Sequence, residues 1–394
     1  MKNWKRLLAL FLAGAMALSL CACKSGGSDS DASPSVYADA TAGDPSASVS
    51  GALDAIPEIV ADLSQGVLEF SAGMSADDVA LTINGEEVSA DLFLYWLDYN
   101  CYYFMMNYGM YGYSISDYAD DLLEDAAYFC ISETLLRQKA LELGCLPTDA
   151  QVDEAQASLD DDTREMLQSG YGLSDASINS LILSDAYYNN VLAALTHDPD
   201  ELELEEYLNA QDFYRVKHIL LKTVDDSRQP LPDDEIAEKR AQAESLLAEL
   251  QAAADLPALF DQRMNELSED GRDGNGDLYA PDGYLTYPGQ MDTSFEAASL
   301  ALEVGGLSEL VESAWGYHII LRLPLAPLAD DESANYNETF RADALNDLIN
   351  QWQDEADITK ADVLSTLDAS DFFNRILVYQ QALAEQNAAE DGVG

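Results

Sequence analysis

The chain has 394 residues, of which 48% are hydrophobic and 9% aromatic, so it can form folded cores despite 73 acidic and 19 basic side chains. At about 150 residues per domain, this length predicts two or three domains. The formal net charge of −54 excludes a nucleic-acid-binding protein and disfavours anionic lipid surfaces, because contact with phosphates requires clustered Lys and Arg.

The first 23 residues resemble a bacterial lipoprotein signal. A short basic region at residues 2–6 precedes an uncharged apolar stretch, 7–20, that is short for a membrane-spanning helix. The sequence Leu-Cys-Ala-Cys at 20–23 then places a small residue directly before a cysteine. We expect residues 1–22 to be a lipoprotein signal peptide and Cys23 to carry the lipid, which predicts an extracytoplasmic chain anchored to the bacterial cell membrane. The alternative is an ordinary cleavage site beside an unmodified cysteine.

A flexible tether is expected next, over residues 23–79. Its first half, to about residue 51, is dominated by Ser, Gly, Ala, Asp and Pro. Such a segment cannot bury enough apolar surface to offset the entropy lost on ordering.

Residues 80–205 read as a strand followed by an all-helical domain. Apolar and polar residues alternate from Ala80 to the Asn84-Gly85 pair, which predicts a strand that ends at a turn. Helical periodicity follows, and the predicted helices span 91–106, 122–144, 149–168 and 177–195. Eight tyrosines lie between Tyr95 and Tyr118, and they can serve either as packing or as a contact surface for an unfolded peptide.

Residues 206–326 predict an α+β domain with a small antiparallel sheet and surrounding helices. Apolar runs at 214–221, 310–313 and 317–323 predict strands. Between them lie an amphipathic helix at 233–250, an apolar stripe at 260–267, and a helix that we expect to begin with a capping box made by Thr293 and Glu296. The remaining segment, 327–394, predicts helices around 345–352 and 370–386 that pack on the first helical domain.

The cysteine and acidic patterns predict no metal site. Cys101, Cys130 and Cys145 form an odd set without paired CxxC motifs, so we expect them to be buried thiols. Asp273 begins a segment like a calcium-binding loop, but Leu278 stands where such a loop needs Gly, and Tyr284 stands where it needs Glu.

Two of the three histidines lie within predicted strands of the α+β domain. His218 is in the opening strand and His318 is in the closing strand. The two can face each other across one sheet, although a histidine on a strand can also be purely structural.

Six motifs in this domain, taken in order, resemble those of parvulin-type peptidyl-prolyl cis/trans isomerases. They are Val216 to Leu221, Leu267 to Asp270, Gly276 to Leu278, Gly289 to Met291 with Phe295 to Ala298, Val304 to Ser308, and Gly316 to Ile320. With the helical flanks and the lipoprotein signal, the whole chain resembles the PrsA-like foldase lipoproteins and their SurA-like relatives. The expected fold is therefore a parvulin-like domain plus a mainly helical SurA/PrsA-like chaperone domain.

The resemblance implies a set of site residues. Its catalytic positions are held by His218, Asp270, Ser313 and His318, with Ser313 bridging the histidines and Asp270 beside the substrate carbonyl. Its substrate-binding positions are held by Leu278, Gln290, Met291 and Phe295, three of which form an apolar socket for the proline ring. About five extra residues between Leu278 and Gly289 depart from the shorter parvulins, and Lys222 and Arg228 do not make a phosphate-recognition cluster.

The implied function is cis/trans isomerisation of X-Pro bonds, without a cofactor, in unfolded or partly folded exported polypeptides. The expected partners are such polypeptides and, through the lipid anchor, the membrane; a homodimer is compatible with the sequence. The alternative is a holdase chaperone that uses an inactive parvulin fold. A Ser-His-Asp hydrolase finds no support, because no GxSxG motif is present.

Overall fold

The computed structural model describes residues 59–272 and 275–391, which form two compact units. The second unit comprises residues 197–341, and the first takes the described residues on either side of it. The predicted signal peptide 1–22, the lipidation residue Cys23 and the first part of the predicted tether lie outside the described residues. Within residues 59–272 and 275–391, no helix is both long and apolar enough to cross a bilayer.

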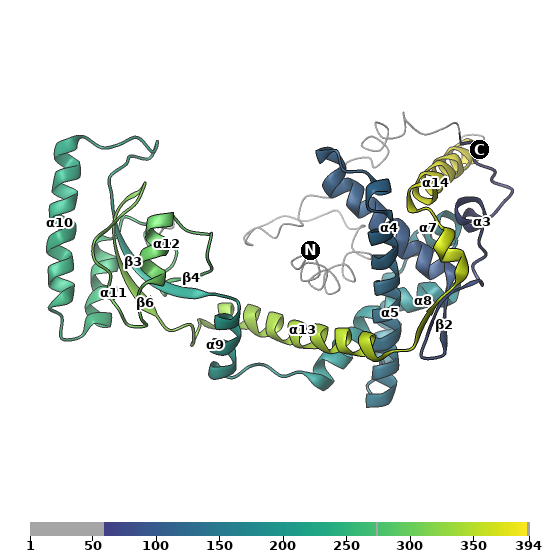
Figure 1. The fold of residues 1–394 in the computed structure, drawn as a ribbon, viewed down its shortest axis with the longest axis horizontal. Coiled ribbons are helices and arrows are strands. Elements are labelled where there is room, and N and C mark those ends of the chain that lie inside the picture. Colours follow the sequence, from purple (N-terminus) through teal and green to yellow (C-terminus); the bar gives the residue numbers. More distant parts are fainter. Residues whose placement is uncertain (1–58, 273–274, 392–394) are drawn as a thin grey trace. The chain divides into compact units, whose positions relative to one another are not determined.

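A three-stranded antiparallel sheet with the order β2-β1-β7 lies in the first unit (Figure 1). Strands β1 (Val79–Ile83) and β2 (Glu86–Ser89) form a hairpin whose turn is the predicted Asn84-Gly85 pair. Both turn residues have positive φ, 53° and 85°, as a two-residue turn matched to the twist of the strands requires. Strand β7 (Ile358–Lys360), which sequence analysis missed, pairs with β1 from the far end of the chain.

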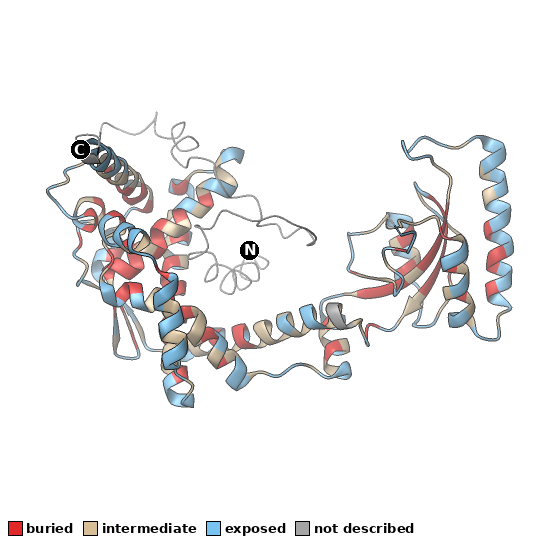
Figure 2. Cartoon of the chain, turned by 180° about the vertical axis from the view of Figure 1, so that it is seen from behind, coloured by how far each residue is buried: buried red, intermediate tan, exposed pale blue. Residues whose placement is uncertain are grey.

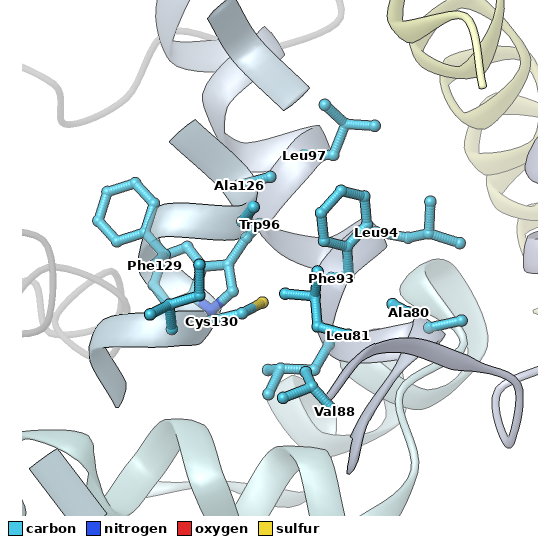
Figure 3. Close-up of a cluster of buried hydrophobic side chains, with 14 of the residues drawn as sticks. Ala80, Leu81, Val88, Phe93, Leu94, Trp96, Leu97, Ala126, Phe129 and Cys130 are labelled. Carbon is cyan, nitrogen blue, oxygen red and sulfur yellow. The ribbon is translucent and has the colours of Figure 1, made fainter. Parts of the chain in front are cut away.

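Helices make up the rest of the first unit. They are α3 (Val67–Ala72), α4 (Ala90–Tyr108), α5 (Ala119–Leu143), α6 (Asp149–Ser158), α7 (Asp161–Tyr171), α8 (Asp175–Leu195), α14 (Ala369–Asp391), the later part of α13 (Asp330–Glu355), and the short 3-10 helices η1 (Gly109–Tyr111), η2 (Ile115–Asp117) and η3 (Asp362–Thr366). The core lies between α4, α5 and the sheet, where Trp96 stacks on Phe129 with ring centroids 4.7 Å apart (Figure 3). Buried Asp91 fastens α4 to α8, because its two carboxylate oxygens accept from Ser177 Oγ and from the Ser174 backbone N–H.

The second unit is built on a four-stranded antiparallel sheet with the order β4-β3-β6-β5 (Figure 1). Its strands are β3 (Tyr214–Lys222), β4 (Tyr284–Thr286), β5 (Val311–Glu312) and β6 (Gly316–Leu323), and its helices are α9 (Glu201–Ala210), α10 (Asp233–Gln251), α11 (Leu256–Leu267) and α12 (Thr293–Leu300). The central strands β3 and β6 are almost continuously buried (Figure 2).

Alternation along the two central strands separates two apolar clusters. Ile219 and Ile319 pack with α10 and α11 on one face of the sheet. Val216 and Ile320 pack with Phe295 of α12 on the other face. Because successive side chains of a strand point to opposite faces, His218 and His318 share the face that α12 covers.

Several expected elements differ in the structure. The predicted tether 23–79 contains α3, whose Val67 and Leu68 are buried in the core of the first unit. The single helix predicted at 149–168 is two helices, because Leu159 is extended and the Asp160 side chain caps a new helix by accepting from the Thr163 N–H.

The start of α12 also differs from the prediction. Its N-cap is Asp292, whose carboxylate accepts from the Ser294 and Phe295 N–H groups, and not Thr293. The Glu296 carboxylate instead accepts from the Gly289 N–H, which ties the preceding loop to the helix. Sequence analysis also missed α9 and the short β4, and it described 327–394 as helical although β7 lies within it.

Candidate active site

Two histidines meet on the face of the second sheet that α12 covers. In the β3–β6 register His218 lies opposite Ile320 and His318 lies opposite Leu220, so the two imidazoles are diagonal neighbours on one face. Their Nδ1 atoms are 3.2 Å apart, and both side chains are buried. The structure therefore brings together the two residues that the sequence singled out.

Asp270 lies at one end of this pair. Its carboxylate Oδ2 is 3.1 Å from His218 Nε2. The segment that carries Asp270 is attached to β3 by buried Ser268, whose hydroxyl accepts from the Leu220 N–H, and by the Glu269 N–H, which donates to the Leu220 carbonyl. Asp270 is thus held by the backbone of the same strand that carries His218.

Ser313 lies at the other end. Its Oγ is 2.7 Å from His318 Nε2 and accepts from the Trp315 backbone N–H. The turn from Ser313 into β6 depends on Gly316, which has φ 149° and lies so close to the Leu221 carbonyl that a Cβ would come within 2.2 Å of it. Only glycine fits there, and the turn it permits positions Ser313 against His318.

The charges at this site follow from burial and hydrogen bonding. Burial raises the pKa of Asp270, but the hydrogen bond and charge of His218, with the hydrogen bonds of Tyr284 and Gly271, outweigh it and hold that pKa below its usual 3.8. Burial, together with the nearby charge of His218, lowers the pKa of His318 to about 3, although Asp292 acts in the opposite direction. At neutral pH, Asp270 is a carboxylate and His318 is a neutral imidazole.

An apolar surface adjoins the two imidazoles. The Phe295 ring meets both of them edge-on, with centroids 5.1 Å from His218 and 5.2 Å from His318. Met291 packs in the same cluster and is only partly buried. Of the four expected substrate-binding residues, these two lie on the α12 side of the sheet, and Phe295 contacts the histidines.

Leu278 and Gln290 are placed differently. Leu278 packs with the cluster on the opposite face, and it lines a cavity of about 10 Å³ beside His218 and Asp270. That volume is about enough for one water molecule, so this cavity is not a socket for a proline ring. Gln290 is exposed in the loop before α12. The expected three-residue socket is therefore a surface of two residues, Met291 and Phe295. Leu278 lies apart from them, at the small cavity beside Asp270.

Sequence analysis missed two residues of this site. The Tyr284 hydroxyl donates to Asp270 Oδ2 at 2.6 Å, and Asp292 acts electrostatically on His318. A Tyr-Leu-Thr run directly after Gly283 is a β-prone signal that could have revealed β4 and Tyr284. Across 59–272 and 275–391, no three His, Cys, Asp or Glu side chains are grouped so that they could hold a metal ion.

Comparison with known proteins gives a family match within the second unit. Residues 202–322 match the family model of the PPIC-type PPIase domain, so the second unit contains a parvulin-type peptidyl-prolyl isomerase domain. The chain more widely is similar to PrsA foldases. The foldase protein PrsA of Staphylococcus aureus (strain Newman) is 26% identical over 229 residues, which cover 53% of this chain and 68% of that protein.

Solved PrsA structures also align with the chain. The structure from Bacillus cereus aligns with 77% of this chain and 99% of its own, at 23% identity and a TM-score of 0.28. The structure from Bacillus subtilis aligns with 76% of this chain and 99% of its own, at 19% identity and a TM-score of 0.23.

Proposed function

We propose that the second unit catalyses cis/trans isomerisation of X-Pro bonds and that the chain is a foldase for exported polypeptides. The observation that carries the proposal is the continuous hydrogen-bonded row Asp270–His218–His318–Ser313 on the same face of the sheet as buried Phe295 and partly buried Met291. The match to the PPIC-type family and the similarity to PrsA foldases support the same reading.

The chemistry requires only that the twisted amide be bound better than the planar one. The planar X-Pro bond is stabilised by resonance that places partial negative charge on its oxygen, and twisting removes it at a cost of about 18–20 kcal/mol. An apolar surface from Met291 and Phe295 that holds the proline ring, with the Asp270 carboxylate nearby, disfavours that charge separation and so favours the twisted form. No covalent step is needed, and the imidazoles serve to hold Asp270 and the surface in place.

This proposal is tested by following cis/trans exchange in X-Pro tetrapeptides by NMR, together with aggregation of a chemically unfolded client. We expect the full chain to accelerate exchange well above the uncatalysed rate. The absence of any acceleration in a folded chain that still suppresses aggregation would contradict the enzyme reading and leave the holdase.

A second candidate function, holding unfolded chains, is favoured by a surface of the first unit. From Tyr99 to Ser116 the chain has no charged residue, although 23% of the whole chain is charged. Around the end of α4 and η1, Met110 is 80% exposed and Tyr111 is 73% exposed. Flexible Met and amphipathic Tyr side chains suit a surface that binds apolar segments of varied sequence.

Replacing both residues, Met110→Ser with Tyr111→Ser, separates the two functions. We expect aggregation suppression to fall about threefold or more while the isomerisation rate stays unchanged, because both residues belong to the first unit. The control is Leu141→Ser, which changes an exposed apolar residue of α5 outside the uncharged run. If the double variant and the Leu141→Ser control suppress aggregation equally well, Met110 and Tyr111 do not form the binding surface.

We also propose that the chain is lipid-anchored at Cys23 on the outer face of the cytoplasmic membrane, supported by the signal-like sequence 1–22 and the similarity to PrsA foldases. Cells fed labelled palmitate should label the wild-type chain and the Cys21→Ala variant but not Cys23→Ala. Labelling of Cys23→Ala, or none of the wild type, would contradict the anchor.

A further inference from the structure

Tyr284 lies beside the row of hydrogen-bonded residues without being part of it. We propose that Tyr284 is a positioning residue, whose hydroxyl fixes Asp270 as a hydrogen-bond acceptor and thereby determines which nitrogen of each imidazole carries a proton. Its kinetic consequence rests on the proposed isomerase function, but the proton arrangement itself does not.

The position of Tyr284 is fixed by three links to β3. Tyr284 pairs with Val216 in the β3–β4 register. The preceding Gly283 has φ 94° and lies so close to the Val216 carbonyl that a Cβ would come within 2.6 Å of it. Buried Arg215 donates from Nη2 to the Asp282 carbonyl at 3.0 Å. Because the segment before β4 is pressed onto β3 in this way, the Tyr284 hydroxyl has a defined place.

That place is against Asp270. The hydroxyl donates to Oδ2 at 2.6 Å, on the same oxygen that faces His218 Nε2 at 3.1 Å. Burial and the hydrogen bond to Asp270 raise the pKa of Tyr284 above its usual 10, so its oxygen keeps the proton. A permanent donor on one side keeps Asp270 a carboxylate, and a carboxylate can only accept. His218 Nε2 must therefore carry a proton.

The rest of the row follows from one shared proton. The Nδ1 atoms of His218 and His318 are 3.2 Å apart, and a hydrogen bond at this distance requires one donor and one acceptor. One of the two Nδ1 atoms is therefore protonated and the other is not. When His218 is neutral, that proton belongs to His318 Nδ1. His318 Nε2 is then unprotonated and accepts a hydrogen bond from the Ser313 hydroxyl at 2.7 Å.

Protonation of neutral His218 to an imidazolium reverses the direction of these hydrogen bonds. The shared proton then belongs to His218 Nδ1, and neutral His318 carries its proton on Nε2 and donates to Ser313 Oγ. The direction of the Ser313 hydroxyl is thus controlled from the Asp270 end of the row, where Tyr284 and His218 meet the same carboxylate oxygen.

The test replaces only the hydroxyl, Tyr284→Phe, in the full chain. We expect the Asp270 carboxyl, followed by ¹³C NMR, to titrate about one pH unit higher than in the wild type, because one hydrogen bond to its charged form is lost. The imidazole ¹⁵N signals of His218 and His318 should move as well. The value of kcat should fall about 3- to 10-fold with KM unchanged, and the acid limb of the rate profile should move to higher pH. The control is Tyr279→Phe, an exposed tyrosine of the same segment.

A double-mutant cycle separates positioning from a general structural role. If Tyr284 acts through Asp270, Tyr284→Phe should change kcat less than 1.5-fold in an Asp270→Asn background, whereas a structural effect should persist there. An unmoved Asp270 titration, or a cycle in which the two effects multiply, overturns the proposal.

Two further outcomes are also decisive. A chain without isomerase activity defeats the proposed function, while the NMR titration still decides the role of Tyr284. If Tyr284→Phe fails to fold, the wild-type titration decides, because an Asp270 midpoint above 3.8 is incompatible with the arrangement described.

Discussion

Replacing Phe295 with Ala should lower kcat/KM for X-Pro isomerisation about 10- to 100-fold. Its ring contacts both imidazoles and, with Met291, forms the apolar surface on which the proposed function places the proline ring. Loss of one hydrophobic contact of this kind removes about 1–3 kcal/mol of transition-state binding. NMR exchange on X-Pro tetrapeptides measures the change.

Stability must be measured alongside activity for this variant. Phe295 is almost fully buried, so truncation should also reduce the free energy of unfolding of the second unit by about 3–5 kcal/mol. Leu300→Ala, on an exposed position of the same helix, is the matched control and should keep full activity. Met291→Ala, at a partly buried position, gives a second variant with a smaller cost in stability. If folded Phe295→Ala keeps activity within twofold of the wild type, the apolar surface is not the proline site.

Glu133→Gln should remove a substantial part of a pH-dependent loss of stability in the first unit. Glu133 is buried on α5, and neither carboxylate oxygen accepts a hydrogen bond of good geometry. Burial raises its pKa from 4.5 to about 8, although nearby Trp96 and Arg137 act in the opposite direction. The folded chain therefore binds this proton more tightly than the unfolded chain, and stability falls as pH rises from 4.5 to 8. At about 1.4 kcal/mol for each unit of pKa, the loss is on the order of 4–5 kcal/mol above pH 8.

Urea unfolding between pH 4 and pH 9 checks this expectation. The wild type and Glu133→Gln should be similar near pH 4, and the variant should be the more stable one at pH 9. A pH dependence of comparable size should remain in the variant from Asp98, whose pKa burial raises from 3.8 to about 7. Glu142→Gln, at an exposed position of the same helix, should follow the wild type. Parallel curves for Glu133→Gln and the wild type would show that Glu133 is ionised in the folded chain.

Sequence patterns predicted the parts of the fold that strong local signals define. The apolar strands around His218 and His318, the Asn84-Gly85 turn, and the long helices at 91–106 and 122–144 all have counterparts in the structure. Each is set by periodicity or by turn chemistry within a few residues, which a single sequence displays.

The missed features depend on distant contacts. Strand β7 has only three residues and exists because Thr359 pairs with Thr82, far away in the chain. Leu278 carries the motif of a pocket residue, but it packs with Ile219 and Ile319 against the other face of the sheet. The position of such a residue is decided by tertiary packing, which local propensity does not encode.

The β1–β7 pairing has a consequence for the order in which the chain matures. In a chain that emerges amino end first, β1 appears early, whereas its partner at residues 358–360 follows only after the whole of 197–341. The second unit, uninterrupted in sequence, can therefore finish folding before the last strand and α14 of the first unit have been made. The second unit is thus the first part of this protein that can be complete, and the first unit remains incomplete for longest.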